Sequence, residues 1–514
     1  MTTPDLHRPF YYRPASPATP PGEWVGDLCI HGGTSGGVIA AVQARRLGHS
    51  VVLLVFGDHV GGMTSSGLGT TDAGNTEAFG GLAREFYQEV GDHYGTAIAW
   101  RFEPGVAGSV FARLLERHGV EVRCRQHLAS VSMDGEALAS ITMDDGNVYR
   151  AKVFIDASYE GDLMARAGVS HTTGREANPV YNEIFNGIHI GHPSHNFERF
   201  VDPYLIAGDP SSGLLPGISS EPPGVNGEGD RRIQAYNFRL CLTQRDDRLP
   251  FPEPRSYDPE RYTLLARHLA TGATEVVPLV ARMPNGKTDT NNSGAFSTDY
   301  IGGNQEWPQA DFATREEIYQ DHVNYIQGLL WFLTSDRRVP GALQEKVSTW
   351  GLAGDEFTQT GGWPPELYIR EARRMVSDYV MTEHDCVGRV QADDPIGLAA
   401  YTMDSHHCRR LVLGGRVVNE GNVEIGGFSP YPISYRSIVP RQGECSNLLV
   451  PFALSASHIA FGSIRMEPVF MALSQSAATA AHLAIREAAP VQRIGYASLR
   501  AALLKDGQIL EWPR

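Results

Sequence analysis

Residues 28–37 read LCIHGGTSGG and decide the fold of this chain of 514 residues. The apolar residues at the start predict a β-strand, and the glycines after them predict a tight turn. An alanine-rich helical stretch follows and ends at Gly48, and a second apolar run, residues 51–55, comes at once. A strand, a glycine-rich turn, a helix and a strand within about 30 residues are typical of the first βαβ unit of a dinucleotide-binding fold.

The glycines of this turn predict a phosphate site. A helix N-terminus presents unpaired backbone N–H groups and the positive end of its dipole, and residues without side chains let a diphosphate come close. Thr34 stands where the GxGxxG pattern normally has its middle glycine. The residues that we expect at this turn are Gly32, Gly33, Thr34, Ser35, Gly36 and Gly37.

The end of the second predicted strand departs from the dinucleotide-binding pattern. An acid normally stands there and binds the adenosine ribose, whereas this chain reads Val55-Phe56-Gly57-Asp58. Two alternatives stay open at this point. Either Asp58 substitutes from the loop, or that hydrogen bond is missing.

Composition restricts the class of protein. Hydrophobic residues make up 42% of the chain and charged residues 20%, which are values of a globular protein. The net charge of −15 argues against binding to nucleic acid, so we expect a small-molecule partner. Six scattered cysteines predict reduced thiols in a cytoplasmic protein, and no metal site stands out. No apolar stretch approaches the roughly 18 residues of a membrane span.

Hydrophobic patterning divides the chain into five predicted parts. They are a polar N-terminal arm (1–26), the first part of the cofactor domain (27–170), a substrate or cap region (171–395), the second part of the cofactor domain (396–490), and a C-terminal helix and tail (491–514).

Shorter patterns predict secondary structure inside these parts. Residues 121–155 read as four short strands with turns at Asp134-Gly135 and Asp145-Gly146, which predict an antiparallel meander returning to a parallel sheet. Helices are expected at 315–332, 366–381, 471–486 and 496–505, and a strand at 447–450.

Longer motifs resemble a known family. Residues 59–69 read HVGGMTSSGLG, residues 156–164 read DASYEGDLM, and residues 465–468 read RMEP. Together with the glycine-rich turn, they resemble a bacterial, xanthan-lyase-like branch of the FAD-dependent oxidoreductases, within the glutathione-reductase-like flavoproteins. The resemblance implies an α/β fold: a Rossmann-like FAD-binding domain, with a parallel sheet and an antiparallel meander, and a large inserted α+β substrate or cap region.

The resemblance also implies where the FAD cofactor would lie. The loop at 61–63 would run beside the isoalloxazine, and the turn at 156–157 would be a second cofactor turn. The segment 457–475 would place a helix N-terminus near the pyrimidine edge, where negative charge builds on reduction. These three segments add the cofactor residues Gly61, Gly62, Met63, Ala157, Glu160, Gly161, Asp162, Ser457, Glu467 and Gln475.

Three positions depart from the family pattern. Members typically have glutamate at the position of Val55, and glycine at the positions of Ser474 and Ala478. We therefore expect this chain to differ in its adenosine contacts and in how closely the flavin approaches the last long helix. A covalent bond from His59 to the flavin is one way to offset lost ribose contacts.

Oxidation of a carbon that bears a hydroxyl needs a hydride acceptor, which a flavin supplies, and a base for the proton. We favour His458 as the base, because the resemblance places it beside the flavin and imidazole titrates near neutral pH. His407 is a further candidate because it follows Asp404, which could orient its imidazole, and Tyr435 and Arg436 come shortly before the C-terminal cofactor segment. The predicted catalytic residues are His458, His407, Tyr435 and Arg436.

Hydrogen-bonding side chains crowd a predicted covering loop at 285–292, which reads NGKTDTNN. Polyhydroxylated ligands need many such groups, although turn residues are common in any loop. Arg465 would hold an anionic substrate or the charge of reduced flavin, or else form a structural ion pair. The predicted substrate-binding residues are Asn285, Lys287, Asp289, Asn291 and Arg465, and the predicted structural ion-pair face of helix 366–381 comprises Arg370, Arg373 and Arg374.

These features favour a flavin dehydrogenase or oxidase that takes a hydride from a hydroxylated small molecule, with a sugar or polyol as one option. The alternatives are a flavin-dependent monooxygenase reduced by NAD(P)H and a redox-silent binding protein, which the missing acid at Val55 suggests. The sequence leaves open the substrate, the electron acceptor and whether the chain forms a homo-oligomer.

Overall fold

A seven-stranded sheet organises the part of the chain that contains the glycine-rich turn in the computed structural model, which describes residues 8–513. Its strand order is β3-β2-β1-β6-β5-β4, and β17 pairs with β6. Residues 1–7 of the predicted arm and Arg514 of the predicted tail lie outside the described residues. The strands are β1 (Glu23–His31), β2 (Val51–Leu54), β3 (Glu121–Arg123), β4 (Leu128–Asp134), β5 (Ala137–Met143), β6 (Val148–Asp156) and β17 (Leu448–Leu449).

The predicted βαβ unit is confirmed, and the predicted meander is confirmed for three of its four strands. β1 pairs in parallel with β2 and β6, and β4, β5 and β6 pair antiparallel. Placing β3 in the meander was wrong, because β3 pairs in parallel with β2. Helices α2 (Gly81–His93) and α3 (Pro104–His118) connect β2 to β3, and a crossover of this kind returns the chain in the same direction.

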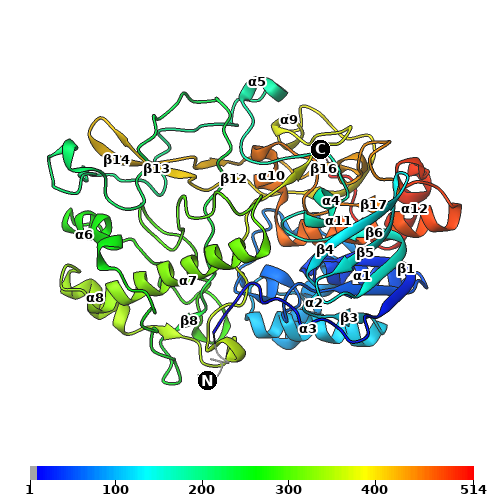
Figure 1. Ribbon diagram of the computed structural model, residues 1–514, viewed down its shortest axis with the longest axis horizontal. Helices are drawn as coiled ribbons and strands as arrows, with labels where there is room; N and C mark the ends of the chain where they lie inside the picture. Colours follow the sequence, from blue (N-terminus) through cyan, green and yellow to red (C-terminus); the bar gives the residue numbers. More distant parts are fainter. Residues whose placement is uncertain (1–7, 514) are drawn as a thin grey trace.

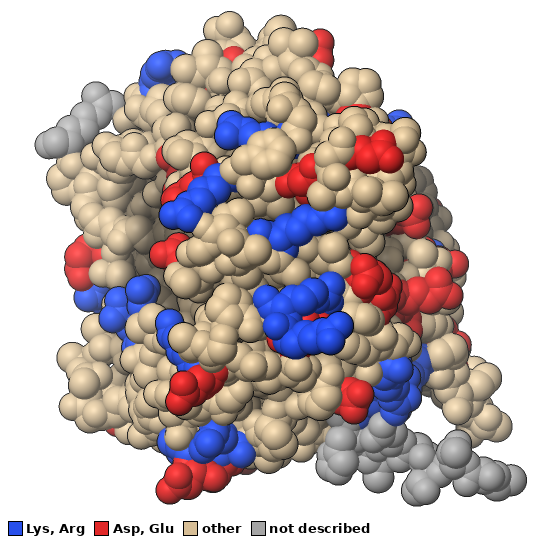
Figure 2. All heavy atoms as spheres, turned by 90° about the vertical axis from the view of Figure 1, so that its left-hand side faces the viewer, with Lys and Arg blue, Asp and Glu red and all other residues tan. Residues whose placement is uncertain are grey.

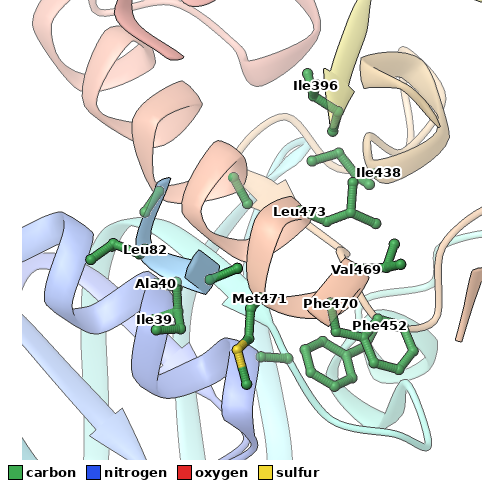
Figure 3. Close-up of a cluster of buried hydrophobic side chains, with 14 of the residues drawn as sticks. Ile39, Ala40, Leu82, Ile396, Ile438, Phe452, Val469, Phe470, Met471 and Leu473 are labelled. Carbon is green, nitrogen blue, oxygen red and sulfur yellow. The ribbon is translucent and has the colours of Figure 1, made fainter. Parts of the chain in front are cut away.

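Two helices from opposite ends of the sequence pack against each other beside this sheet. They are α1 (Ser35–Arg46) and α11 (Glu467–Glu487), drawn in blue and orange in Figure 1. Figure 3 shows Met471 of α11 next to Ile39 and Ala40 of α1. Ala477, Ala480 and Ala481 are fully buried, and such small side chains let helix backbones approach closely.

Residues from the middle of the sequence form a second hydrophobic core. It includes Tyr262, Leu329, Leu330 and Trp363, all at most 1% exposed. Figure 1 shows this part in green, on the side away from β1. Its elements include α6 (Thr263–Ala270), α7 (Phe312–Ser335), α8 (Gly341–Ser348), β8 (Leu242–Thr243) and β9 (Gly351–Leu352).

The remaining helices and strands are short. The helices are α4 (Asp162–Arg166), α5 (Asn178–Tyr181), α9 (Glu383–Cys386), α10 (His458–Ile464) and α12 (Tyr496–Lys505). The strands form two-stranded sheets and are β7 (His171–Thr172), β10 (Arg374–Met375), β11 (Pro395–Ala399), β12 (Met403–Ser405), β13 (Arg409–Leu413), β14 (Arg416–Glu420), β15 (Val423–Ile425) and β16 (Tyr431–Ser434).

The prediction of a helix at 366–381 was wrong. These residues, all described, run through the interior as an irregular segment in which only β10 is regular. Arg370, Arg373 and Arg374 are each at most 8% exposed, and they pair with carboxylates from different parts of the chain. An extended chain points its side chains in opposite directions and so reaches partners on two sides. The ion-pair function of these arginines is confirmed.

The described surface carries charges of both signs. Figure 2 shows Lys and Arg side chains interspersed with Asp and Glu on the face over α6, α7 and α8. An interspersed pattern gives this face no large field of one sign. Among residues 8–513, no helix combines the length and the apolar composition that crossing a bilayer demands. The six cysteines, all within that range, are free thiols.

Candidate functional site

The glycine-rich turn holds three chain segments at close range. Gly32 has φ 115°, and a Cβ built on it would lie 2.5 Å from the backbone of Ala157. A Cβ on Gly36 would lie 2.4 Å from Ser474 Oγ of α11. Thr34 Oγ1 accepts a hydrogen bond from Gly37 N and caps α1. Glycine is therefore required here both for backbone conformation and for close approach.

The loop after β2 lies against this turn. Gly61 N donates to Gly33 O at 2.7 Å, and Gly62 begins a short 3₁₀-helix with φ 57°. Met63 N donates to Tyr159 OH at 2.9 Å. The turn after β6 joins them, because Thr34 Oγ1 also donates to Ala157 O at 2.9 Å.

A carboxylate lies at the N-terminus of α1. Glu467, the first residue of α11, is 4% exposed and accepts from three hydroxyl groups. The donors are Ser35 Oγ at 2.5 Å, Thr64 Oγ1 at 2.7 Å and Tyr159 OH at 2.8 Å. Burial raises the pKa of Glu467. The first-turn amides of α1 lie at the same place and are donors of the kind that bind an anion, so the residues present fit a diphosphate.

The acidic residues after β6 have partners of their own. Glu160 Oε1 accepts from Tyr11 OH at 3.0 Å. Asp162 pairs with Arg315 at 2.6 Å and with Arg373 at 2.7 Å. Burial opposes ionisation of Asp162, but the two guanidinium groups outweigh it and lower its pKa. Gly161, with φ 66°, precedes α4 in a left-handed conformation.

Two of the predicted cofactor residues lie away from the glycine-rich turn. Ser457 caps α10 and donates to Glu183 Oε1 at 2.6 Å. Gln475 lies over the start of α2, where its Oε1 accepts from Leu82 N at 2.8 Å. The segment 457–475 contains two helix N-termini, and the one at Glu467 is the one that reaches Ser35.

Aromatic side chains occupy the end of β2. Val55 is buried against Gly33, whose Cβ would lie 2.6 Å from Val55 Cγ1. The Phe56 ring stacks on Tyr11, with ring centres 4.5 Å apart. Asp58 pairs at the surface with Arg125 at 2.8 Å. Its carboxylate is therefore engaged elsewhere, which favours the alternative that the usual ribose hydrogen bond is missing.

A small cavity adjoins Glu467. Phe452 and Phe470 stack with ring centres 4.0 Å apart, and Figure 3 shows the pair at the start of α11. Tyr368, Arg370 and Arg465 line the cavity together with these rings. It therefore combines apolar faces with guanidinium groups beside the proposed anion site.

Buried charges form a network behind the cavity. Arg465 pairs with Asp404 at 2.8 Å, and Arg370 pairs with Asp299 at 2.9 Å. His406 lies between these carboxylates, with Nδ1 2.7 Å from Asp299 Oδ2 and Nε2 3.4 Å from Asp404 Oδ2. Burial opposes ionisation of Asp299, but Arg370 and His406 lower its pKa to about 2.

The four predicted catalytic residues are scattered in the structure. His458 Nδ1 is 2.7 Å from Glu371 Oε2, and Nε2 is 3.0 Å from Ser405 Oγ. Gln234 bonds to both Glu371 and Arg465, which links His458 to the cavity. The others lie elsewhere: His407 is buried with a lowered pKa, Tyr435 OH donates to Val491 O, and Arg436 pairs with Asp393 and Asp394.

The predicted substrate residues divide between two clusters. Asn285 and Lys287 bond to Glu103, and Lys287 also pairs with Glu356 at 2.7 Å. In contrast, Asp289 pairs with Arg239 at 2.6 Å, and Asn291 Oδ1 accepts from Arg370 at 2.9 Å. Arg465 lines the cavity itself.

The sequence reasoning missed several residues that the structure brings to this place. Tyr159 stood inside the quoted DASYEGDLM motif, which was a signal for it. His406 stood beside the chosen His407. Tyr368 lies in the stretch 367–374, LYIREARR, which also resembles the family. Nothing in the local sequence marked Phe452, because its proximity depends on long-range packing.

Glu366 provides a test of the electrostatics of this region. Burial raises its pKa to about 8, with added repulsion from Glu467 and Glu160. Between about pH 4.5 and 8 the Glu366 carboxyl group is therefore protonated in the folded state and ionised in the unfolded state. The free energy of unfolding falls as pH rises through that window. Glu366→Gln is expected to raise the free energy of unfolding by roughly 2 kcal/mol at pH 8.5 and to leave it nearly unchanged at pH 4.

Denaturant titrations at the two pH values measure this effect. The matched control is Glu345→Gln, at an exposed position on α8, which should change neither value. An equal effect of Glu366→Gln at both pH values would argue against a proton held at Glu366.

Comparisons with known proteins add to this geometry. A family model described as FAD dependent oxidoreductase matches residues 27–503. Among solved structures, the chain is similar in part to the flavin-dependent brominase Bmp2 (20% identity, 30% of this chain and 42% of that chain, TM-score 0.24). It is also similar in part to a geranylgeranyl bacteriochlorophyll reductase-like protein from Thermoplasma acidophilum (19% identity, 29% of this chain and 43% of that chain, TM-score 0.23). A third partial similarity is to cyclohexanone monooxygenase (20% identity, 26% of this chain and 26% of that chain, TM-score 0.21). The chain spans less than half the length of each. No curated protein sequence matches it.

Proposed function

Because this chain belongs to the FAD-dependent oxidoreductase family, we propose that it oxidises a hydroxylated small molecule and passes the hydride to its FAD cofactor. The observation that carries the proposal is the arrangement at the start of α1. Three hydroxyl groups there donate to the carboxyl group of Glu467, beside a cavity lined by Arg370 and Arg465.

The residues at the glycine-rich turn would bind the diphosphate. Ser35 and Thr64 supply hydroxyl donors, and Gly32 and Gly36 keep the approach free of side chains. Each of these hydroxyl groups has one proton, so Ser35 and Thr64 would turn from Glu467 to a bound phosphate. Burial raises the pKa of Glu467, and a carboxyl group that takes up a proton more readily repels a phosphate less.

The cavity residues would orient the substrate and accept its proton. FAD, when bound, supplies the hydride acceptor. The stacked rings of Phe452 and Phe470 give the cavity an apolar wall, which would strengthen the interactions of Arg465 with an oxygen of the substrate. We propose that Asp404 accepts the proton of the oxidised hydroxyl and releases it to solvent, since its side chain is 21% exposed.

Anaerobic reduction of the bound flavin tests the proposal. A panel of sugars and polyols is expected to bleach the flavin of the purified protein, and NADPH alone is expected to leave it oxidised. If NADPH bleaches the flavin and no hydroxylated compound does, the flavin-dependent monooxygenase becomes the better assignment. If no reductant bleaches the flavin, the redox-silent alternative applies.

The finer expectations from the sequence are also proposals. The motifs support placing the chain in the xanthan-lyase-like branch, with residues 171–395 as the region that covers the site. We also propose that the protein is cytoplasmic, that it forms a homo-oligomer, and that an electron acceptor reoxidises the flavin.

A further inference from the structure

Four buried polar atoms without a hydrogen-bond partner gather around Tyr368. Among residues 8–513, they are Asn237 Oδ1, Arg239 Nη1, Arg370 Nε and Arg465 Nε. The four residues are each at most 5% exposed. Buried polar atoms in proteins nearly always have a partner, so these three donors and one acceptor retain bonding capacity for a ligand.

The geometry joins these residues into one cluster, which we call the Tyr368 cluster. The guanidinium carbons of Arg239, Arg370 and Arg465 lie 5.6, 4.7 and 6.0 Å from the centre of the Tyr368 ring. Arg465 Nη1 donates to Tyr368 OH at 3.0 Å, and Tyr368 N donates to Asn237 O at 2.8 Å. Tyr368, Arg370 and Arg465 also line the cavity beside Glu467, which has a volume of about 10 Å³, so a ligand larger than water would have to displace side chains that line it.

Each arginine of the cluster is already neutralised by its own carboxylate. Asp289 accepts two hydrogen bonds from Arg239, and Asp299 and Asp404 pair with Arg370 and Arg465. A fourth carboxylate, Asp72, is 3.8 Å from Arg239. The cluster therefore has no excess of positive charge with which to attract an anion.

Neutral hydroxyl groups satisfy such a site better than anions do. A hydroxyl accepts from an N–H group and also donates to a carboxylate, and the cluster offers both. The carboxylates of Asp72 and Asp404 are the accessible acceptors, with side chains 30% and 21% exposed. An anionic ligand would accept from the arginines but would be repelled by these two aspartates.

We propose that the Tyr368 cluster is the substrate-binding site and that it takes a neutral polyhydroxylated molecule, with neighbouring hydroxyls, in preference to a carboxylate or phosphate. This inference rests on the proposed function and names the substrate class for the same cavity.

Matched pairs of compounds test the preference for a neutral ligand. The oxidised FAD-loaded protein is titrated with D-glucose and D-glucuronate, and with D-galactose and D-galacturonate, while its unfolding temperature and flavin absorbance are followed. The neutral member of at least one pair is expected to raise the unfolding temperature and perturb the flavin spectrum. The uronate of that pair is expected to do neither at the same concentration.

Two variants locate the binding site. Arg370→Lys keeps a positive charge near Asp299 but removes the unpaired Nε, and it is expected to weaken binding of the neutral compound about tenfold. In turnover, KM should rise more than kcat falls. Tyr368→Phe removes only a hydroxyl and should weaken binding less. The matched control is Arg374→Lys, at a buried arginine whose three nitrogens are all bonded, and it should leave binding unchanged.

The outcomes separate this inference from the proposed function. Tighter binding of a uronate than of its neutral partner overturns the inference and leaves the oxidation of a hydroxylated compound in place, as does unchanged binding in Arg370→Lys. If neutral compounds bind but only NADPH reduces the flavin, the binding inference stands and the proposed oxidation fails. If no neutral polyol binds the oxidised protein, the inference is overturned whatever the reaction.

Discussion

Gly36→Ala is expected to weaken FAD binding at least tenfold and to destabilise the fold by about 1–3 kcal/mol. The added Cβ would lie 2.4 Å from Ser474 Oγ, 2.5 Å from Phe452 Cε2 and 2.9 Å from Phe470 O. Phe470 O belongs to the backbone of α11, so the contact is relieved only if α1 and α11 move apart. That movement separates Ser35 from Glu467 and opens the diphosphate site. Flavin retention on gel filtration and thermal unfolding with added FAD measure the two effects.

Two controls accompany this variant. Gly57→Ala introduces a Cβ that meets nothing within 4 Å, and we expect it to bind FAD as the parent protein does. Ser474→Gly in the Gly36→Ala background removes the Oγ contact but keeps the contact with Phe470 O, so recovery should be partial. Normal FAD affinity in Gly36→Ala would contradict close packing of α1 on α11 as the support of the site.

Arg465→Gln is expected to destabilise the protein by roughly 3 kcal/mol at neutral pH and to reduce turnover at least a hundredfold. The Arg465 side chain is 2% exposed, and its loss leaves the carboxylate of Asp404 without its guanidinium partner. Removing one member of a buried pair costs about 3–5 kcal/mol, and the partial exposure of Asp404 places the expected value at the low end.

The pH dependence of this effect has a definite sign. Burial opposes ionisation of Asp404, but His406 and then Arg465 lower its pKa. The resulting stabilisation is present above the unfolded pKa, about 3.9, and is lost as pH falls below it. The difference between the parent protein and Arg465→Gln should therefore shrink below about pH 4, which denaturant titrations across pH would detect.

A double variant separates stability from activity at this pair. Asp404→Asn combined with Arg465→Gln leaves no unpaired charge, so most of the lost stability should return while turnover stays low. If Arg465→Gln is as stable as the parent at neutral pH, or if the double variant regains turnover, the pair does not have the function that we assign to it.

Local patterns predicted the cofactor half of the fold well. Glycines 32–37 and the apolar runs around them depend on neighbours within a few residues, and the structure confirms the strand, turn, helix and strand. The turns at Asp134 and Asp145 likewise specify hairpins locally. The predicted pairing of β3 was wrong. The observed parallel pairing with β2 depends on the crossover through α2 and α3, which residues 121–125 do not encode.

Local patterns failed where buried charges decide the structure. Residues 366–381 have the composition of a helix. However, Arg370 and Arg374 form ion pairs with Asp299 and Glu176, which come from distant parts of the chain. Tertiary interactions of this kind override helix propensity. Long-range packing also brought Tyr368 to the cavity and His406 to the carboxylates behind it, and the spacing of these residues in the sequence does not predict that.

The central claim is that the glycine-rich turn, Ser35 and Thr64 bind the diphosphate of FAD beside the start of α11. The most direct test is to denature the purified protein, identify the released chromophore by chromatography and quantify it against the chain. The account predicts FAD released in equimolar amount, and FAD taken up again by the stripped protein but not by Gly36→Ala. A colourless protein that takes up no FAD, or equal uptake by both proteins, would contradict it.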